Sequence, residues 1–318
     1  MATPPIQRFL TQASLARETT WGTGVAASSA DQFLPVLTIS PSEDFDPIPD
    51  QGFRSRASRT QGYQYGFAQG TVKFDMQVFP DICGNIFTGI LGLDTPTTSG
   101  TTTSHAITVV NNALPPSYSF DDFSGADGAA ARRFTGQYID TVQLTGAGTG
   151  PMKMAVTMIG KTATTATKAT ATYTNASPFI PYQAAITLNS VSNAKLVSYD
   201  ITLKRAVETV PAMGSQQPSA GNSGQLDVTG KLIWAPTDGT EWNLYNTGTQ
   251  SGFPLKLIWT SGTNILTLQM TSTNFEKGSV LDRGSEYVKF NSSFIAEDNA
   301  TDGGACKIVL VNSLARTY

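Results

Sequence analysis

The sequence predicts a mainly β fold, and three observations lead to this prediction. Several segments alternate apolar and polar residues with a period of two, which is the pattern of strands that have one face on a core. Thr, Ser and Gly are plentiful and charged residues make up only 14% of the chain, a composition that suits sheets. Hydrophobic residues make up 40%, which is too many for a disordered protein.

Size, charge and cysteine content limit the functions to consider. At 318 residues the chain is long enough for one large domain or two ordinary ones. A formal net charge of −3 and a pI near 5.2 do not fit a basic nucleic-acid-binding surface. Cys83 and Cys306 lie far apart, so we expect reduced, buried thiols. There is no signal-peptide pattern and no run near the ~20 apolar residues of a membrane helix, so we expect a soluble protein made in the cytoplasm, without membrane contact.

Residues 1–32 are expected to form an N-terminal arm with Trp21 as its aromatic anchor, before a strand over 33–39. The loop over 41–70 follows, and its opposite charges are segregated. The acidic residues come first and the basic residues second: Glu43, Asp44, Asp46 and Asp50, then Arg54, Arg56 and Arg59. This arrangement suits head-to-tail contact between copies of the protein. A solvated loop with internal ion pairs, each worth ~0–1 kcal/mol, would show the same pattern, and both interpretations stay open.

A clear strand and a short helix come next. The apolar positions of the strand are Val72, Phe74, Met76 and Val78. Apolar residues of 82–91 recur at spacings of three and four, which predicts an amphipathic helix capped near Asp81 and closed by Gly92. Further short strands are expected over 105–110, 117–120, 138–144 and 152–158. Residues 162–194 are interpreted as a linker with exposed strands.

The strongest alternation lies in the second half of the chain. Two strands, over 197–203 and 226–234, enclose a loop over 206–224 in which Glu208 is the only charge. A loop this long inside a compact domain is usually functional or disordered. We interpret it as reaching another copy of the protein through its apolar residues Val207, Val210 and Met213. A turn into a short helix near 242–245 follows, and then strands over 255–259, 266–270, 288–296 and 307–311.

The order of elements suggests an internal duplication. In both halves a strand, a long polar loop, an alternating strand, a proline and a short helix follow one another. An offset of 156 residues places Val72 on Val228 and Pro80 on Pro236. We therefore expect a first β domain over 33–161 and a second over 195–318, although β proteins can share such a pattern by chance. A duplicated subunit can close a ring with half the usual number of copies.

The residues that carry chemistry do not gather into a motif. His105 is the only histidine, and we expect it at the surface or at a strand end. Three Cys and His residues are too few for the usual zinc site. Asp121, Asp122 and Asp127, like Asp298 and Asp302, are expected to form turns. We find no phosphate-binding loop or dinucleotide fingerprint, and we predict a non-enzymatic protein with no catalytic residue, metal or cofactor.

Three stretches resemble a known family. The first is Glu18-Thr-Thr-Trp-Gly-Thr23, followed by Leu34-Pro-Val36. The second is the hairpin formed by 197–205 and Val228-Thr-Gly-Lys-Leu-Ile-Trp234, with the Pro-Thr-Asp turn after it. The third is the C-terminal part, 294–302 and 306–312, with the terminal Tyr318. On these residues the chain resembles the major tail tube proteins of long non-contractile-tailed bacteriophages.

The resemblance implies a tail-tube-type β-sandwich or barrel with short flanking helices, which polymerises into stacked rings of a virion tail after assembly in the host bacterial cytoplasm. It implies partners: other copies, as a trimeric ring with pseudo-sixfold symmetry or as a hexamer, a tape measure protein, and tail terminator and tip proteins. Double-stranded DNA would pass through without specific binding. The two loops would touch adjacent rings, and the lumen-facing candidates are Asp75, Gln77, Asp227 and Thr229.

Two other functions stay open. One is a different virion component, such as a capsid decoration or baseplate protein. The other is a carbohydrate-binding or hydrolytic β-sandwich that would use the carboxylates of Asp121, Asp122 and Asp127.

Overall fold

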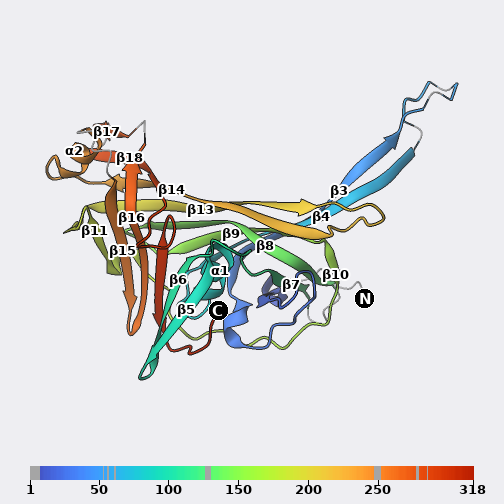
Figure 1. Cartoon of the computed structure of the whole chain (residues 1–318), viewed down its shortest axis with the longest axis horizontal. Helices are drawn as coiled ribbons and strands as arrows, with labels where there is room; N and C mark the ends of the chain where they lie inside the picture. Colours follow the sequence, from blue (N-terminus) through green and yellow to red (C-terminus); the bar gives the residue numbers. More distant parts are fainter. Residues whose placement is uncertain are drawn as a thin grey trace.

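The computed structural model describes residues 8–52, 54–55, 57–60, 62–125, 130–246, 252–276, 279–284 and 286–318. This part of the chain contains nineteen strands and two α-helices (Figure 1). The strands pair antiparallel in one large network that does not close on itself. The prediction of a mainly β, sandwich-like fold with short flanking helices is confirmed.

The first half of the chain contributes ten strands and one helix. Its elements are β1 (Gln12–Arg17), β2 (Phe33–Leu34), β3 (Val36–Asp50), β4 (Gly62–Gln77), α1 (Cys83–Leu91), β5 (Gly92–Ser99), β6 (Thr102–Val109), β7 (Tyr118–Ser124), β8 (Ala130–Ala147), β9 (Lys153–Gly160) and β10 (Ala163–Thr165). A short 3-10 turn at Arg8–Leu10 precedes β1, and another at Ala30–Gln32 precedes β2. Strand β1 pairs with β2 and β7.

The second half contributes nine strands and one helix. Its elements are β11 (Ala184–Leu188), β12 (Val191–Ser192), β13 (Leu196–Val210), β14 (Ala220–Trp234), α2 (Thr240–Asn246), β15 (Phe253–Ser261), β16 (Asn264–Phe275), β17 (Val280–Asp282), β18 (Lys289–Ala296) and β19 (Lys307–Asn312). A 3-10 turn at Pro181–Gln183 precedes β11.

Eight strands form a sheet that we call the platform. Their spatial order is β3-β4-β9-β8-β13-β14-β18-β17. Figure 1 shows the platform strands across the top of the body, with α1, β5, β6 and β7 beneath them. The long strand β8 belongs to both layers, because its first part pairs with β7 and its second part pairs with β13. The core lies between the layers.

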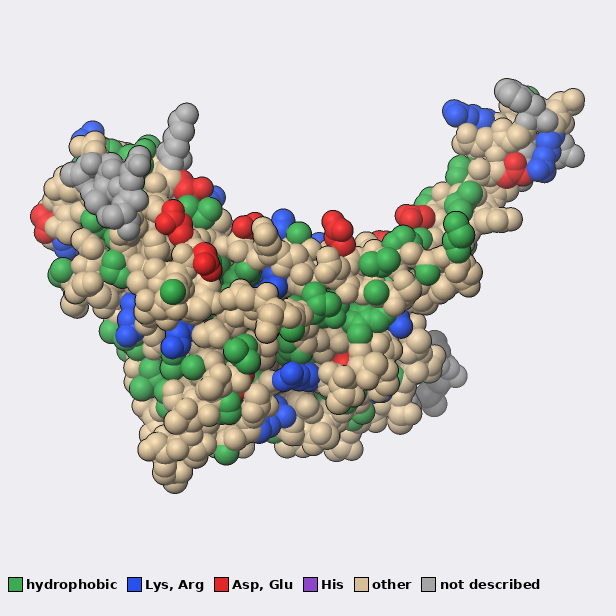
Figure 2. Space-filling model, in the orientation of Figure 1, with side chains coloured by type: hydrophobic (Ala, Val, Ile, Leu, Met, Phe, Trp, Pro, Cys, Tyr) green, Lys and Arg blue, Asp and Glu red, His purple; other side chains and the backbone are tan. Residues whose placement is uncertain are grey.

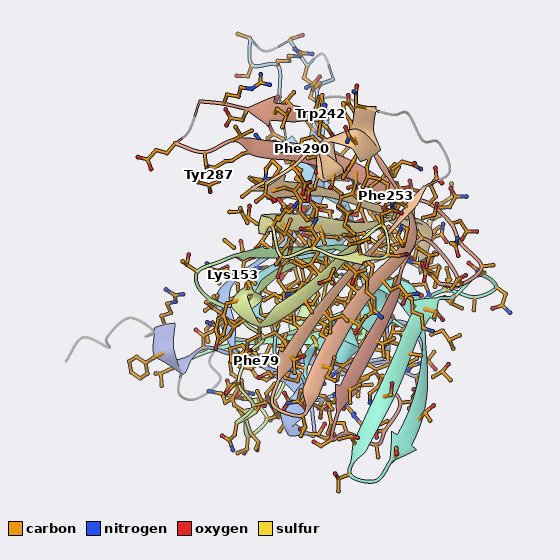
Figure 3. All side chains as sticks on the ribbon, turned by 90° about the vertical axis from the view of Figure 1, so that its left-hand side faces the viewer. Phe79, Lys153, Trp242, Phe253, Tyr287 and Phe290 are labelled. Carbon is orange, nitrogen blue, oxygen red and sulfur yellow. The ribbon has the colours of Figure 1, made fainter. Side chains whose placement is uncertain are left out.

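The platform strands alternate as predicted. Their core-facing side chains are fully or almost fully buried, among them Phe74, Met76, Ile201, Leu203, Leu232 and Trp234. Helix α1 lies against them, and all nine of its residues are buried. Helix α2 covers another part of the core, where Trp242 meets Phe290 of β18 edge-to-face with ring centroids 5.7 Å apart (Figure 3). Both helices lie where the sequence places them.

The start of α1 differs from the prediction. Gly92 ends the helix with a left-handed φ of 109°, as expected of a C-terminal glycine. The N-cap, however, is Ile82, and no side chain caps the helix. The predicted cap, Asp81, accepts a hydrogen bond from the Thr174 hydroxyl instead. The Asp81 carboxylate thus contacts the distant Thr174 and does not cap the helix.

Both predicted loops are mostly strand. Residues 41–50 and 62–70 pair with each other in the β3–β4 hairpin, and 207–210 pairs with 220–223 in the β13–β14 hairpin. The prediction of loops failed for two physical reasons. Pro41, Pro47 and Pro49 interrupt the strand pattern, yet proline is tolerated on the edge strand β3. In the second hairpin, small polar residues pair through their backbones although this end of the hairpin buries little apolar surface.

The strand pairing recurs in the two halves of the chain. The order β3-β4-β9-β8 matches β13-β14-β18-β17, and the β7–β8 hairpin matches the β15–β16 hairpin. The first part of β8 thus corresponds to β16 and its second part to β17. Three register irregularities also recur at corresponding places. They lie between Val36/Thr38 and Leu196/Ser198, between Phe45/Pro47 and Arg205/Val207, and between Tyr118/Phe120 and Phe253/Leu255.

These irregularities fix which residues correspond. Val36 corresponds to Leu196, and their partners Met76 and Trp234 correspond across an offset of 158 residues. The offset of 156 predicted from the sequence was therefore wrong by two. A pattern with a period of two fits equally well after a slip of two residues, because the same faces stay buried.

Candidate assembly surfaces

The open face of the platform carries all four residues predicted to face a lumen. Asp75 and Gln77 lie on β4, where Thr38 on β3 donates a hydrogen bond of 2.6 Å to Asp75. Asp227 and Thr229 lie on β14, opposite Lys204 and Thr202 of β13. The structure thus places them in two groups on one face of the sheet, with β9, β8 and β13 between the groups.

Charges of both signs are interspersed on this face. The acidic residues are Asp44, Asp75, Asp200, Asp227, Glu276 and Asp282, and the basic residues are Lys73, Lys153, Lys204, Lys231 and Lys289. Several face each other across strands, such as Lys204 and Asp227 or Asp200 and Lys231. Figure 2 shows acidic side chains with basic ones among them along the upper rim of the body. The open face is therefore polar and nearly balanced in charge.

The outer part of the β3–β4 hairpin, residues 45–65, projects from the body (Figures 1 and 2), and we call it the arm. Among its described residues the exposed large apolar side chains are Phe45, Ile48, Tyr63 and Tyr65, with 42%, 56%, 66% and 66% of their surface accessible. The rings of Phe45 and Tyr65 meet edge-to-face with centroids 5.9 Å apart. Exposed apolar patches of this kind mark sites of contact with other molecules, so we expect another molecule to cover the arm.

The charged residues predicted to touch another copy lie along the arm and at its base. Asp44 and Asp46 are exposed on β3, and Glu43 lies 3.7 Å from Arg132 of β8. Asp50 and Arg54 form an ion pair with each other at the tip. Arg59 is exposed in the connecting loop, and Arg56 lies outside the described residues. The sequence interpretation of internal ion pairs therefore holds for Asp50 and Arg54.

The tip of the β13–β14 hairpin is in a different environment. It lies along the base of the arm, where the Ala68 amide donates to the Gln216 carbonyl at 2.8 Å and the Gln216 side chain donates to the Tyr65 carbonyl at 2.7 Å. Val207 is buried, Val210 is half-exposed and Met213 is fully exposed. Of these three apolar residues, only Val210 and Met213 are thus available to another molecule.

An internal junction between β8 and β13 joins the two halves of the platform. Seven residue pairs run from Ser198 opposite Ala147 to Lys204 opposite Thr141. The Val207 amide extends the junction by donating to the Asp140 carboxylate at 3.1 Å.

Arg205 is the one charged side chain buried at this junction among the described residues of β13. It is 4% exposed and donates to the carbonyls of Ile90 and Leu91 at the end of α1, and to that of Gly224. Burial lowers the pKa of its guanidinium. The carbonyl end of a helix carries partial negative charge, which favours a cation at this place.

Comparison with known proteins identifies the family. The family model of phage tail tube proteins matches residues 9–305, nearly the whole chain. The chain belongs to the phage tail tube protein family. The resemblance proposed from the sequence is thus confirmed, and the protein is a structural component of a phage tail. No curated protein matches the chain.

The first motif that carried the resemblance has a clear structural role in this tail tube protein. The buried Glu18 carboxylate accepts hydrogen bonds from the hydroxyls of Ser117 and Ser119 and from the amides of Gly22 and Gly136, all at 2.8–2.9 Å. The Trp21 indole donates to the Gly136 carbonyl at 3.1 Å. The motif therefore anchors the N-terminal segment to β7 and β8. The sequence predicted Trp21 as an aromatic anchor, but it pointed to Glu18 only through the family resemblance.

His105 does not lie at the surface, so that prediction was wrong. It is fully buried on β6. Its Nδ1 lies 3.0 Å from the Asp94 carboxylate and its Nε2 lies 2.9 Å from the Leu314 carbonyl. The backbone amide of Tyr318 also donates to Asp94. The alternation of the buried residues Thr103, His105 and Ile107 was the available signal. Nε2 thus holds the C-terminal segment directly, and Nδ1 contacts the carboxylate that holds the Tyr318 amide.

Asp121 and Asp122 do not form a turn either. They are buried on β7 and pair with Arg133 and Arg132 of β8, each at 2.6 Å. Asp127 lies outside the described residues. The sequence could not show the pairing, because the arginines become neighbours only when β7 and β8 form their hairpin. These carboxylates are engaged within the fold.

Cys83 and Cys306 are buried free thiols, as predicted. Burial raises the pKa of both thiols, that of Cys306 to about 12. In the described part of the chain no three His, Cys, Asp or Glu side chains come together as a metal site. The helices described here are all too short or too polar to cross a membrane.

Proposed function

We propose that this tail tube protein polymerises into stacked rings and forms the conduit through which DNA leaves the virion. One observation carries the proposal. The platform consists of two four-stranded units joined edge to edge through β8 and β13. Its two free edges, β17 and β3, are the strands that correspond to β8 and β13. Such a sheet can continue from copy to copy, and a ring leaves no exposed edge.

Three chains per ring would supply six such units, a trimer with pseudo-sixfold symmetry. The recurring pairing order and its three matching irregularities support this copy number over a hexamer. On the same grounds we propose two related tail-tube-like domains, which include the ranges 33–161 and 195–318. Strand pairing extends the first back to β1 and the second back to β11.

The open face of the platform would line the channel. Its mixed charges would neither bind phosphate tightly nor repel it strongly, which lets a duplex slide without specific binding. Before DNA passes, the same face would surround a tape measure protein. Nothing in the proposal requires catalysis by this subunit.

The arm would contact the adjacent ring. Its exposed apolar residues and the acidic residues near its base support this role, together with Val210 and Met213 of the second hairpin. At the two ends of the tube, terminator and tip proteins would meet the same surfaces. Assembly would take place in the host bacterial cytoplasm.

Electron microscopy of the purified protein tests the proposal. We expect tubes or stacked rings with a central channel, and a threefold cross-section when averaged. A protein that stays monomeric at every concentration, and that is absent from virion tails, would refute the proposal. A strictly sixfold cross-section with one chain per repeat would refute the trimer.

A further inference from the structure

The two ends of the platform carry free strand edges of different kinds. Among the described residues, β3 pairs only with β4 and β17 pairs only with β18. Figure 1 shows these strands at opposite ends of the molecule. A contact between the β3 edge of one copy and the β17 edge of the next is therefore heterologous, and it repeats until a ring or a filament forms.

The internal junction provides a template for that contact. β13 corresponds to β3, because both strands have 15 residues and share two register irregularities with their hairpin partners. The second part of β8 corresponds to β17. Gln143 lies opposite Ala155 of β9, and Val280 lies opposite Asn291 at the equivalent position of β18.

We propose that β3 of one copy pairs antiparallel with β17 of a second copy, in the register that joins β13 to β8. Inside the chain, Asp200 faces Thr145 and Thr202 faces Gln143. Between copies, Ser40 then faces Asp282 and Ser42 faces Val280. This inference rests on the proposed function and adds to it the two edges and their alignment.

The residues at these edges fit the pairing. On the open face, the Ser40 hydroxyl meets the Asp282 carboxylate, which can accept its hydrogen bond. On the core side, Pro41 meets Leu281, which already packs against the core. Phe45 takes the place of Arg205, one residue beyond the last pair of the internal junction.

Pro41 changes the hydrogen bonding that the β3 edge can offer. The Val207 amide points toward β8 and the Val210 carbonyl points toward β14, where it accepts from Ser219. Residues of β13 with odd numbers therefore direct their backbone groups at β8, and Ile201 is one of them. Its equivalent, Pro41, has no N–H to offer. The β3 edge thus lacks one donor, so the proposed β3–β17 ladder has one hydrogen bond fewer here than the internal β13–β8 ladder.

The same geometry identifies a pair suited to cross-linking. Thr202 and Gln143 form a non-hydrogen-bonded pair, whose Cα atoms lie about 4.5 Å apart in antiparallel sheets. That separation lies within the ~4.4–6.8 Å range that a disulfide bridges. Ser42 and Val280, their equivalents between copies, are exposed, and the native thiols are buried.

The test mixes two single variants, Ser42→Cys and Val280→Cys, under conditions in which tubes form. We expect a reducible dimer after mild oxidation, and none from either variant alone. The control replaces Ser42→Cys by Thr38→Cys, which lies on the same face but four residues along the ladder, about 14 Å away at ~3.4 Å per residue. This control should lose the dimer. The double variant Thr202→Cys/Gln143→Cys should cross-link within one chain and shows that the oxidation works.

The possible results separate the register from the function. If tubes form but Thr38→Cys links to Val280→Cys as well as Ser42→Cys does, the register is wrong and the tube function stands. If tubes form and no edge pair links while the internal pair does, the edges do not meet. If the protein never assembles, both the register and the proposed function fall.

Discussion

Replacing Tyr65 by serine should weaken tube formation without weakening the fold. A tyrosine side chain can bury ~150–250 Å², and two-thirds of Tyr65 is accessible, so covering it in a ring–ring contact removes roughly 100–160 Å² from water. At ~25 cal/mol per Å², and after allowance for the polar hydroxyl, the contact contributes about 2–3 kcal/mol. The critical concentration for assembly should therefore rise roughly 30- to 150-fold.

Sedimentation over a concentration series measures this shift, and thermal unfolding of the unassembled protein checks that the fold is intact. Tyr182 provides a matched control, because it is 71% exposed but lies outside the arm and the two platform edges. Tyr182→Ser should leave the critical concentration unchanged. Equal shifts for both variants, or no shift for Tyr65→Ser, would contradict a role of the arm in stacking.

Three further predictions concern the fold and the channel. Arg205→Ala should lower the free energy of unfolding by roughly 3–5 kcal/mol in urea titrations, because it removes three hydrogen bonds that a buried cation donates to backbone carbonyls. A loss below ~1 kcal/mol would contradict this. Cys83 and Cys306 should resist a thiol reagent at pH 8 until the protein unfolds. Burial raises the pKa of Cys306 from 9 to about 12, so the contribution of this thiol to stability is complete below pH 9 and should decline as the pH rises toward 12. Denaturation at a series of pH values measures this decline. Rapid labelling of either thiol in the folded protein would argue against burial. Asp227→Lys should leave tubes intact but slow DNA release from virions, and an unchanged release rate would place this residue outside the channel.

The sequence predicted elements where the pattern is local. The buried positions of β4, β13 and β14 follow from their period of two, and α1 follows from its spacing of apolar residues. The ends of both hairpins were missed, because prolines and small polar residues hide strand pairing that the partner strand supplies. The correct alignment of the two halves was missed for a related reason, since alternation cannot distinguish registers that differ by two.

The assembly surfaces were predictable only in part. The open-face positions of Asp75 and Asp227 follow from alternation, whereas the free edges of β3 and β17 depend on which strands are neighbours in space. The buried positions of His105 and Asp121 depend on Leu314 and Arg133, which are distant in the chain or belong to another strand. No local window of sequence contains those partners.

The β8–β13 junction has a consequence for how the tail grows and comes apart. Because it lies within one polypeptide, it forms at a high effective concentration that dilution cannot change. In the proposed tube, only the joints between chains would respond to protein concentration, so a dissolving tube would release linked pairs of units. The residues at the internal β8–β13 junction and at the proposed β3–β17 contact can also differ from each other. In the joint proposed between copies, Phe45 would lie at the position that Arg205 fills within the chain, so an exposed aromatic ring there corresponds to a buried charge in the internal junction.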